Sequence, residues 1–415
     1  MNDDWIETTL GDCCTITIGR TPPRGDSRYW TQDLTRPFCT IADMNGEMVT
    51  PSREGVTELA EAEGKAKRFP AGSLLMSFKL TIGRMGFAAC DVFTNEAIAW
   101  LDVQDPTLDV RFLSLWLASQ DLSTGSGRAV KGNTLNSSSM NAITVPVPPL
   151  PVQRRIVDLM AHLDNQIANL RLERDAGRGL RKATLSNLLD ATREIPADYD
   201  AAFDLAASAQ QASPTSEQAM NDDWQVVALE EVVDILDARR RPVNSNERQQ
   251  RVGDVPYYGA TGQAGWIDDS IFDERLVLLG EDAVDFGNPD ASKAYVIEGP
   301  SWVNNHAHVL RARESAVLTD FLCHSLNVVD YSDYVAFGTR SKLTQGNMRG
   351  ISLTLPLLPV QRRIVDLMAH LDKQIAGMDV EVSTLESLRR QLLASLLSQG
   401  VELPASYDLL LDGVA

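Results

Sequence analysis

Arginine and lysine side chains gather in turn-rich segments of this 415-residue chain. Arg20, Arg24 and Arg28 fall within the stretch GRTPPRGDSRYW, and a run of three arginines begins at Arg239. A guanidinium group presents several donors in a planar fork, which fits phosphate oxygens and the acceptor edge of guanine. Clusters of this kind recur in both halves of the chain. Binding to a nucleic acid is therefore favoured over solvated surface charge.

No catalytic constellation accompanies these clusters. The sequence holds no GxxxxGK[ST] phosphate loop, no glycine-rich dinucleotide fingerprint, and neither the NPPY-type tetrapeptide nor the FxGxG run of adenine methyltransferases. His306 and His308 alternate along one expected strand, but no HExxH motif or third ligand stands near them, so structural roles are favoured and no metal site is expected. We expect a binding protein and not an enzyme, with no cofactor of its own.

Composition sets further bounds. The formal net charge is −19, and neither residues 1–149 nor residues 220–357 are basic overall, so any phosphate binding must rely on local patches. Five scattered cysteines without CxxC spacing fit a reducing compartment. The chain has no apolar run of 18 residues and no signal-peptide core. We expect a cytoplasmic protein with no membrane partner.

The elements that must position the basic clusters follow from an internal repeat. LPVQRRIVDLMAHLD occurs unchanged at 150–164 and at 358–372, and MNDDW occurs at 1–5 and at 220–224. The segments between these repeats align poorly. The chain is thus two half-proteins in tandem, with near-identical ends around divergent middles.

Each repeated segment predicts a long helix with one apolar stripe. Ile156, Met160, Leu163, Ile167 and Leu170 follow 4-3-4-3 spacing, and the second copy continues the same pattern from Ile364 to Leu385. A helix of about 40 residues, roughly 60 Å long, needs a partner for its stripe, and the other copy is the obvious one. In the first copy Arg174 and Gly177 occupy the next seam positions, which predicts a weaker stretch midway.

The remaining segments read as mixed α/β structure. Strands are expected at CTITI, SLLMSF and EAIAWLDV in the first half, and at LVLLGED, AYVIEG and HAHVLRA in the second. Short helices are expected at 110–119 and near 318–328. Residues 201–219, rich in Ala, Ser and Gln, predict a linker.

Taken together, these motifs resemble the specificity subunit of type I restriction-modification systems. The resemblance is carried by the two helix starts, PPLPVQRRIV and LLPVQRRIV, and by MSFKLTIGR, FTNEAIAW, VPYYGATGQAGWIDDSIFDE, WVNNHAHVL and GTRSKLTQGN in this order. It implies an α+β fold with two mixed α/β target-recognition domains in tandem, 1–149 and 220–357. A central helix (150–200), the linker 201–219 and a C-terminal helix with its tail (358–415) complete the chain. The helices would pair as an antiparallel coiled coil with pseudo-two-fold symmetry.

The resemblance also implies function and partners. Such a subunit is non-catalytic and reads a bipartite, asymmetric site in double-stranded DNA, while its helices set the unread spacer and dock two methyltransferase subunits for adenine N6 methylation. Restriction and translocase subunits would complete the cleaving complex of this phage-defence system. S-adenosylmethionine, ATP and Mg²⁺ are expected only in the partner subunits.

Candidate contacts follow from the turns and from the repeated helix starts. The candidate DNA-binding residues are Arg20, Thr21, Arg24, Arg28, Lys79, Arg84, Arg128, Lys131, Arg239, Arg240, Arg241, Tyr257, Tyr258, Thr339, Arg340 and Lys342. The candidate subunit-docking residues are Gln153, Arg154, Arg155, Asp158, Gln361, Arg362, Arg363 and Asp366. Asn95, Asn304 and Asn305 are expected to hold turns.

Two other functions fit parts of the pattern. The high net negative charge is compatible with an acidic coiled-coil scaffold or a DNA mimic that blocks a nuclease, although the arginine-rich loops disfavour it. The same DNA-reading architecture in a defence system without a restriction subunit is also compatible with the sequence.

Overall fold

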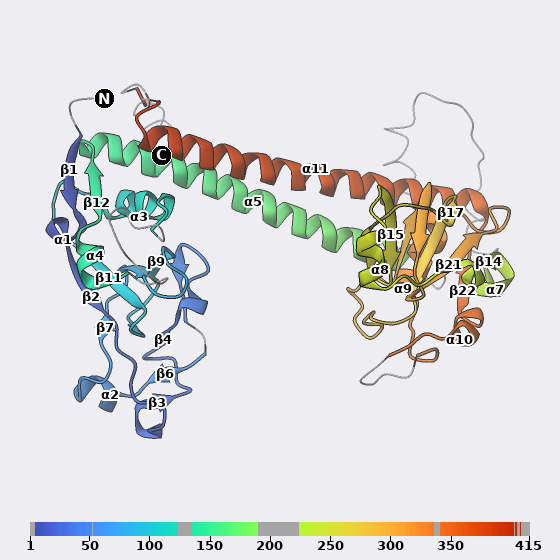
Figure 1. The fold of residues 1–415 in the computed structure, drawn as a ribbon, viewed down its shortest axis with the longest axis horizontal. Helices are drawn as coiled ribbons and strands as arrows, with labels where there is room; N and C mark the ends of the chain where they lie inside the picture. The colour runs from blue at the N-terminus through green and yellow to red at the C-terminus, as the bar shows by residue number, and fades with distance from the viewer. Residues whose placement is uncertain are drawn as a thin grey trace. The chain divides into compact units, whose positions relative to one another are not determined.

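The computed structural model describes residues 5–51, 53–122, 135–189, 224–335, 341–401, 403–404 and 407 (Figure 1). The chain divides into two compact units. The first unit is Met1–Leu170 with Glu381–Ala415, and the second unit is Arg171–Val380. Each unit combines one strand-rich domain with segments of two long helices, so the division cuts through both helices. The five sequence segments expected above stay a prediction, and the linker 201–219 lies outside the described residues.

The first unit is built on a five-stranded sheet in the order β2-β11-β8-β9-β5. Its strands are β1 (Ile6–Thr9), β2 (Cys14–Ile18), β3 (Trp30–Thr31), β4 (Phe38–Cys39), β5 (Met48–Val49), β6 (Gly55–Val56), β7 (Arg68–Phe69), β8 (Leu74–Ser77), β9 (Met85–Ala88), β10 (Val92–Thr94), β11 (Ile98–Val103) and β12 (Thr144–Val147). Strand β8 is buried at every residue, as expected of an apolar run at the centre of a sheet. Smaller sheets pair β1 with β12, β3 with β6, and β4-β10-β7.

Short helices complete the first unit. They are α1 (Leu10–Cys13), η1 (Ser27–Tyr29), η2 (Ile41–Asp43), α2 (Glu58–Ala62), α3 (Val110–Ser119) and α4 (Ser137–Asn141). Asp109 caps α3 by accepting hydrogen bonds from the amides of Arg111 and Phe112. The bounds of β2 and α3 coincide with the strand CTITI and the helix at 110–119 that the sequence predicts.

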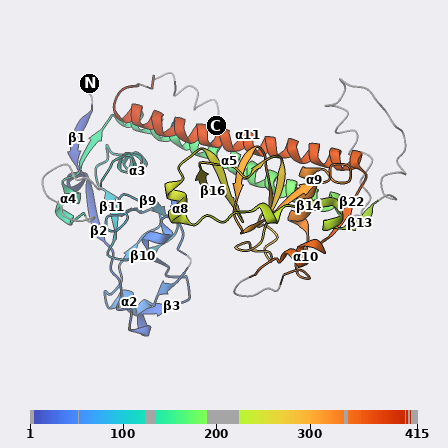
Figure 2. The ribbon, with the colours of Figure 1, turned by 45° about the vertical axis from the view of Figure 1, so that its right-hand side comes forward.

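The second unit contains two four-stranded sheets, β14-β21-β18-β19 and β16-β15-β20-β17, and the pair β13-β22. Its strands are β13 (Gln225–Ala228), β14 (Val233–Ile235), β15 (Val255–Gly259), β16 (Gly262–Ile267), β17 (Phe272–Asp273), β18 (Leu276–Gly280), β19 (Ala294–Ile297), β20 (Pro300–Val303), β21 (Ala307–Ala312) and β22 (Ser352–Leu355). Its helices are α7 (Leu229–Val232), η3 (Asp237–Arg239), α8 (Ser245–Gln250), α9 (Thr319–Val328) and α10 (Gln345–Arg349). Strands β13 and β22 adjoin the N-terminal end of α11 (Figure 2).

The two units share one frame although their middle segments align poorly. The amide of Leu10 donates to the carbonyl of Ile143 at 2.8 Å, and the amide of Leu229 donates to the carbonyl of Ile351 at 2.8 Å. The order β2-β11-β8-β9 in the first unit matches β14-β21-β18-β19 in the second. Backbone pairing therefore preserves a topology that side-chain identity does not reveal.

The two long helices are α5 (Leu150–Leu188) and α11 (Leu358–Leu397), which confirms the predicted helices and their length. In the first unit Asp164 of α5 pairs with Arg389 of α11, and in the second unit Arg181 of α5 pairs with Asp372 of α11. Within each unit the helical segments thus run antiparallel.

Each helix pair buries its stripe in the core of its own unit. In the first unit Ile156, Met160 and Leu163 share one cluster with Leu393 and Leu396. In the second unit Ile364 and Met368 share one cluster with Leu185 and Leu188, and Leu371 packs against it. Helix α5 continues without a break through the positions predicted to weaken it: Arg174 pairs with Asp379, and Gly177 lies beside Ile375. Among the described residues, no helix is long and apolar enough to cross a membrane.

Candidate nucleic-acid interface

The arginines that follow β2 lie on one loop of the first unit. The guanidinium carbon of Arg24 lies 3.8 Å from the centroid of the Trp30 ring, and its Nη1 donates to Oε1 of Glu54 at 2.7 Å. Trp30 is itself held by a hydrogen bond from Nε1 to the carbonyl of Pro23 at 3.1 Å. Stacking and ion pairing fix the direction of Arg24 while 52% of its side chain stays exposed.

The neighbouring candidates also carry internal partners. Arg28 pairs with Asp26 at 2.7 Å, and Nη1 of Arg20 donates to the carbonyl of Gly64 at 2.6 Å. Thr21 donates a hydrogen bond to Glu96. Three carboxylates, those of Asp26, Glu54 and Glu96, therefore lie among the basic residues, and this loop is less positive than its arginine count suggests.

Three candidate DNA-binding residues of the first unit lie near the carboxylate of Glu96. The hydrogen bond from Thr21 lowers the pKa of Glu96, and the charges of Lys79 and Arg24 lower it further. Lys79 lies in the turn between β8 and β9, where its ammonium is 5.4 Å from the centroid of Phe78. The structure thus places Thr21, Arg24 and Lys79 around one carboxylate.

Arg84 begins the other arm of that turn and belongs to a different cluster. It is exposed, and its Nη1 donates to the carbonyl of Ile41 at 3.2 Å and to Oδ1 of Asn45 at 3.3 Å. Arg128 and Lys131, also expected to bind DNA, lie outside the described residues.

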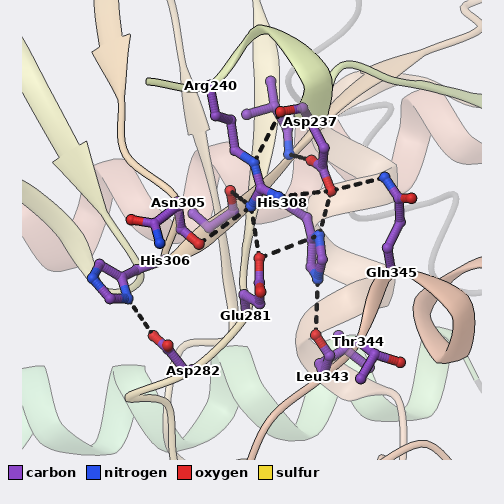
Figure 3. Close-up of polar contacts among 12 residues, drawn as sticks. Asp237, Arg240, Glu281, Asp282, Asn305, His306, His308, Leu343, Thr344 and Gln345 are labelled. Atoms are coloured by element: carbon purple, nitrogen blue, oxygen red, sulfur yellow. Dashed lines mark hydrogen bonds and ion pairs between the residues drawn. The ribbon is translucent and has the colours of Figure 1, made fainter. Parts of the chain in front are cut away.

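In the second unit a buried ion network stands where the sequence shows a run of arginines (Figure 3). Arg240 is only 15% exposed, and its Nη1 donates to Oε2 of Glu281 at 2.7 Å and to the carbonyl of Ala307 at 2.8 Å. Its Nη2 lies 3.3 Å from Oδ2 of Asp237, whose side chain is 4% exposed. Arg240 therefore ties η3 to the ends of β18 and β21, and in this structure it serves the fold.

His308 lies at the centre of this network. Its Nδ1 lies 2.6 Å from Oδ2 of Asp237 and its Nε2 lies 2.9 Å from the carbonyl of Leu343. Both neighbours offer acceptor oxygens to the ring nitrogens. His308 thereby connects β21 to η3 and to the segment before α10. The structural role expected for this histidine is confirmed.

Hydrogen bonds decide the charge state of the two carboxylates. Burial raises the pKa of Asp237, but donation from His308 and from the amide of Val309 outweighs burial, and the net pKa lies below its usual value. Glu281 behaves alike: burial raises its pKa, but hydrogen bonds from Arg240 and Lys342 outweigh burial, and the net pKa lies below its usual value. Both groups are thus held as anions between cations.

The equivalent positions of the first unit carry no such network. By strand register, Ala99 occupies the position of His308, and Ile18 occupies the position of Asp237. Phe78 occupies the position of Glu281. The two units therefore put different chemistry on one frame.

The adjacent tyrosines Tyr257 and Tyr258 of β15 point to opposite sides of their strand and differ in exposure. Tyr257 is 2% exposed and donates through its hydroxyl to the carbonyl of Val243 at 3.2 Å, so it is a core residue and not an accessible DNA contact. Tyr258 is half-buried, with its ring 6.0 Å from that of Tyr295. Successive side chains of a strand face opposite sides, which is why only one of the pair can reach a ligand.

The other candidates of the second unit are accessible where they are described. Lys342 is 55% exposed and pairs with Glu281 at 2.9 Å. Arg239 is 47% exposed, pairs with Glu274 at 3.1 Å and lies over the ring of Phe272. Arg241 is exposed. Thr339 and Arg340 lie outside the described residues.

Two arginines that follow the arginine run in sequence, and that were not among the candidate DNA contacts, lie over aromatic rings of the second unit. Arg248 lies over the Tyr257 ring at 4.7 Å and Arg251 over the Trp302 ring at 4.5 Å, both from the segment around α8. Trp266 on the adjoining hairpin is 55% exposed. The interleaving of Arg, Tyr and Trp in 248–266 was the signal available in the sequence.

Turn asparagines hold equivalent corners in both units. Oδ1 of Asn95 accepts from the amide of Ala97 at 3.0 Å, and Oδ1 of Asn304 accepts from the amide of His306 at 2.8 Å. Both asparagines form Asx turns just before the longest strand of their sheet. The structural role expected for them is confirmed. For Asn305, the carbonyl accepts a 3.4 Å hydrogen bond from Arg240.

The candidate docking residues separate into exposed and buried sets. Arg154, Asp158, Arg362, Arg363 and Asp366 are exposed, and the half-buried Arg155 donates to the carbonyl of Leu403 at 3.4 Å. Gln153 and Gln361 are completely buried, so their side chains cannot dock a partner. The 4-3-4-3 stripe extended back from Ile156 reaches position 153, which was the signal for this burial.

No group of three or more His, Cys, Asp or Glu side chains able to hold a metal ion occurs among the residues that the structure describes.

Comparisons with known proteins bear on what such an arrangement does. The sequence matches the family model "Type I restriction modification DNA specificity domain" at residues 2–175 and again at 221–383, together more than half of the chain. The two matches fall on the two halves of the repeat.

Relatives and solved structures agree with this match. The chain is similar to the putative type I restriction enzyme specificity subunit S.HindORF215P of Haemophilus influenzae, with 32% identity over 34% of this chain and 35% of that protein. It is also similar to the type I restriction enzyme MjaIX specificity subunit of Methanocaldococcus jannaschii, with 26% identity over 40% of this chain and 39% of that protein. The matched region thus spans little more than a third of each relative.

The fold likeness extends over almost the whole chain. A solved type I restriction-modification S subunit from M. genitalium covers 95% of this chain at TM-score 0.52 and 16% identity, with 97% of that chain covered. A structure described as showing complex assembly and conformational transition of the type I R-M system covers 96% at TM-score 0.60 and 16% identity, with 98% of that chain covered. On the two family matches, the chain belongs to the type I restriction-modification DNA specificity family.

Proposed function

We propose that this chain is the non-catalytic DNA-specificity subunit of a type I restriction-modification complex, in which each unit reads one half of a bipartite, asymmetric site. One observation carries the proposal: a single frame occurs twice in the chain, and the accessible basic side chains on its loops differ, with Arg24 and Arg84 in the first unit and Arg239, Arg241 and Lys342 in the second. Unlike surfaces on like frames suit unlike half-sites. Family membership supports the proposal.

The helices take the second role in the proposal. The exposed residues Arg154 and Asp158 in the first unit recur as Arg362 and Asp366 in the second, at the same positions of identical helices. An identical surface presented once in each unit suits two copies of one partner, here the methyltransferase subunit. Restriction and translocase subunits would join that assembly. S-adenosylmethionine, ATP and Mg²⁺ would act in those partners.

The test is base-modification sequencing of DNA from cells that express this chain with its cognate methyltransferase subunit. N6-methyladenine on both strands of one interrupted, asymmetric motif is the expected result. Exchange of residues 220–357 for those of a relative should then alter one half of the motif and leave the other intact. An assembled complex that methylates no interrupted motif would contradict the proposal and favour a scaffold or DNA-mimic role.

The acidic charge gives little support to the DNA-mimic alternative. A mimic needs free carboxylates in phosphate-like rows. Here several glutamates are paired instead: Glu54 with Arg24 at 2.7 Å, Glu61 with Arg68 at 2.8 Å, and Glu274 with Arg311 at 2.6 Å. These carboxylates are neutralised by arginines of the same chain and do not form a row of free negative charges.

A further inference from the structure

The start of each long helix carries a glutamine that is buried without any exposed surface. In the first unit, Oε1 of Gln153 accepts a hydrogen bond from the amide of Asp109 at 2.7 Å. Its Nε2 donates to the carbonyls of Thr107 and Pro148, both at 2.7 Å. One side chain therefore joins the first turn of α5, the segment that leads into α5, and the N-terminal end of α3.

The second unit repeats this arrangement bond for bond. Oε1 of Gln361 accepts from the amide of Leu318 at 3.0 Å, and its Nε2 donates to the carbonyls of Ala316 at 3.0 Å and Pro356 at 2.9 Å. Asp109 is the N-cap residue of α3 and Leu318 is the N-cap residue of α9. The two glutamines thus contact equivalent atoms of domains whose sequences otherwise differ.

This chemistry is specific for glutamine. The amide group offers two donors and an acceptor at once, and its three neighbours are two carbonyls and one N–H. A glutamate would set a negative oxygen against two carbonyls, and an apolar side chain would leave all three backbone groups without this partner in a buried site. The buried bonds resist rotation of the domain about the start of its helix.

Small rotations at this point matter for reading DNA. A domain of this size is roughly 30 Å across, so a tilt of about 7° moves its far side by about 3.5 Å, close to the rise of one base pair. A joint that holds the domain to a few degrees therefore distinguishes spacers that differ by one base pair.

We infer that Gln153 and Gln361 are positioning residues that lock each recognition domain to its own helix and so restrict the target to one spacer length. The inference rests on the proposed function. It assigns to the two repeated glutamines a role inside the chain that is separate from half-site recognition and from partner docking.

The experiment compares methylation patterns of the full chain assembled with its methyltransferase subunit. Gln153→Met and Gln361→Met keep the length of the side chain and remove its polar group. Gln391→Met serves as the matched control, because Gln391 is an exposed glutamine on α11. Substrates carry the native motif with its spacer unchanged, one base pair longer or one base pair shorter. For each variant of the buried pair, we expect the preference for the native spacer to fall roughly tenfold, as the loss of a buried hydrogen-bonding partner implies. Both half-sites should be unchanged.

A second variant separates a positioning role from simple loss of stability. In Gln153→Glu the buried carboxyl faces two carbonyls, which favours its protonated form. Protonation restores one donor and the acceptor, so spacer preference should recover as the pH of the assay is lowered from about 8 to about 6. Loss of packing alone would show no such pH dependence beyond that of the wild-type complex.

The outcomes are distinct. A relaxed spacer in both methionine variants, with unchanged half-sites, an unaffected Gln391→Met control and recovery of Gln153→Glu at low pH, supports the inference. A strict spacer in the wild-type complex that stays equally strict in both methionine variants overturns the inference alone. A wild-type complex that methylates no interrupted motif overturns the proposed function and this inference with it.

Discussion

Asp164 and Arg389 form a two-pronged ion pair, with Nη2 of Arg389 donating to Oδ2 of Asp164 at 2.7 Å. Arg181 and Asp372 form the same contact in the second unit, at 2.8 Å. Asp372 is the repeat counterpart of Asp164, and Arg389 is the counterpart of Arg181, each 208 residues further along. The two ion pairs are therefore equivalent under the internal repeat, with the aspartate and the arginine taken from opposite helices. The helix pairing in each unit obeys one register.

Charge reversal tests this register. Arg389→Glu places two carboxylates against each other in the first unit, and we expect the free energy of unfolding to fall by about 1 kcal/mol, since exposed pairs contribute about 0–1 kcal/mol and repulsion adds a similar amount. The double variant Asp164→Arg with Arg389→Glu should recover most of the loss. Urea denaturation gives the double-mutant cycle. The cycle at Arg181 and Asp372 is the internal control, and additive effects at both pairs would argue against the contacts.

The network around Asp237 should make the second unit sensitive to acid. Asp237 and Glu281 both have a folded-state pKa below the usual values of 3.8 and 4.5. A carboxyl whose pKa is lowered by folding stabilises the protein above its unfolded pKa and loses this contribution as the pH falls through the folded pKa. Asp237→Asn should therefore cost about 3 kcal/mol near neutral pH, as removal of one partner from a buried ion pair does. The difference from wild type should shrink below about pH 4. Denaturant melts monitored between about pH 3 and pH 7 would measure it, and a difference independent of pH would contradict the assignment.

Arg241 offers the cleanest test of a DNA contact in the second unit. The residue is exposed and follows the buried Arg240, so its substitution spares the ion network. Arg241→Ala should weaken binding of the assembled complex to its DNA by about 1–3 kcal/mol without lowering its melting temperature. A salt titration of the affinity then tells the two kinds of contact apart, because loss of a phosphate contact lowers the slope by about one and loss of a base contact relaxes one position of the motif. Arg349→Ala, which removes an exposed ion pair with Glu230, is the control.

In the first unit, Arg24 should act through its stacked orientation. Trp30→Ala removes the ring beneath the guanidinium but leaves the ion pair with Glu54. We expect weaker methylation of the native target site. The binding free energy should fall by about 0.5–2 kcal/mol, since a cation over an aromatic face is stabilised by about that amount. Arg24→Lys should show a similar loss, because a lysine cannot present the planar fork. Binding equal to wild type in both variants would exclude Arg24 from the interface.

A helix insertion tests the spacer role. Four residues inserted after Asn169 alone should disturb the register of α5 and reduce stability. A matched variant carries four extra residues after Asn169 and four after Val380, next to the limits of the two units. These insertions leave the ion pairs within each unit intact. The matched insertions add about 6 Å of helix, which corresponds to about two base pairs. Methylation mapping should reveal a longer spacer between unchanged half-sites, and an unchanged spacer would count against the helices as the ruler.

The sequence alone determined the duplication, the two long helices, the family, and the strands β2, β8, β11, β18, β19 and β21 of the two sheets β2-β11-β8-β9-β5 and β14-β21-β18-β19. These features depend on local signals: fifteen identical residues, a 4-3-4-3 stripe, and short apolar runs bounded by turn residues, each of which acts within a few residues along the chain. CTITI and VRFLSLWLAS are strand and helix at those very residues.

Tertiary structure decided which polar residues are free to act. Tyr257 and Tyr258 are neighbours in sequence, yet one is core and the other partly accessible, because the pairing of β15 fixes which side of the strand faces inward. Arg240 looked like its two neighbours, but it donates hydrogen bonds to Glu281 and Ala307, both more than 40 positions away, and is only 15% exposed. Gln153 and Gln361 looked like an exposed repeated surface and are instead buried joints, satisfied by backbone groups of another segment. The heptad spacing gave a local signal for the burial of Gln153, but none marks the burial of Tyr257 or Arg240, which depends on hydrogen bonds between distant segments.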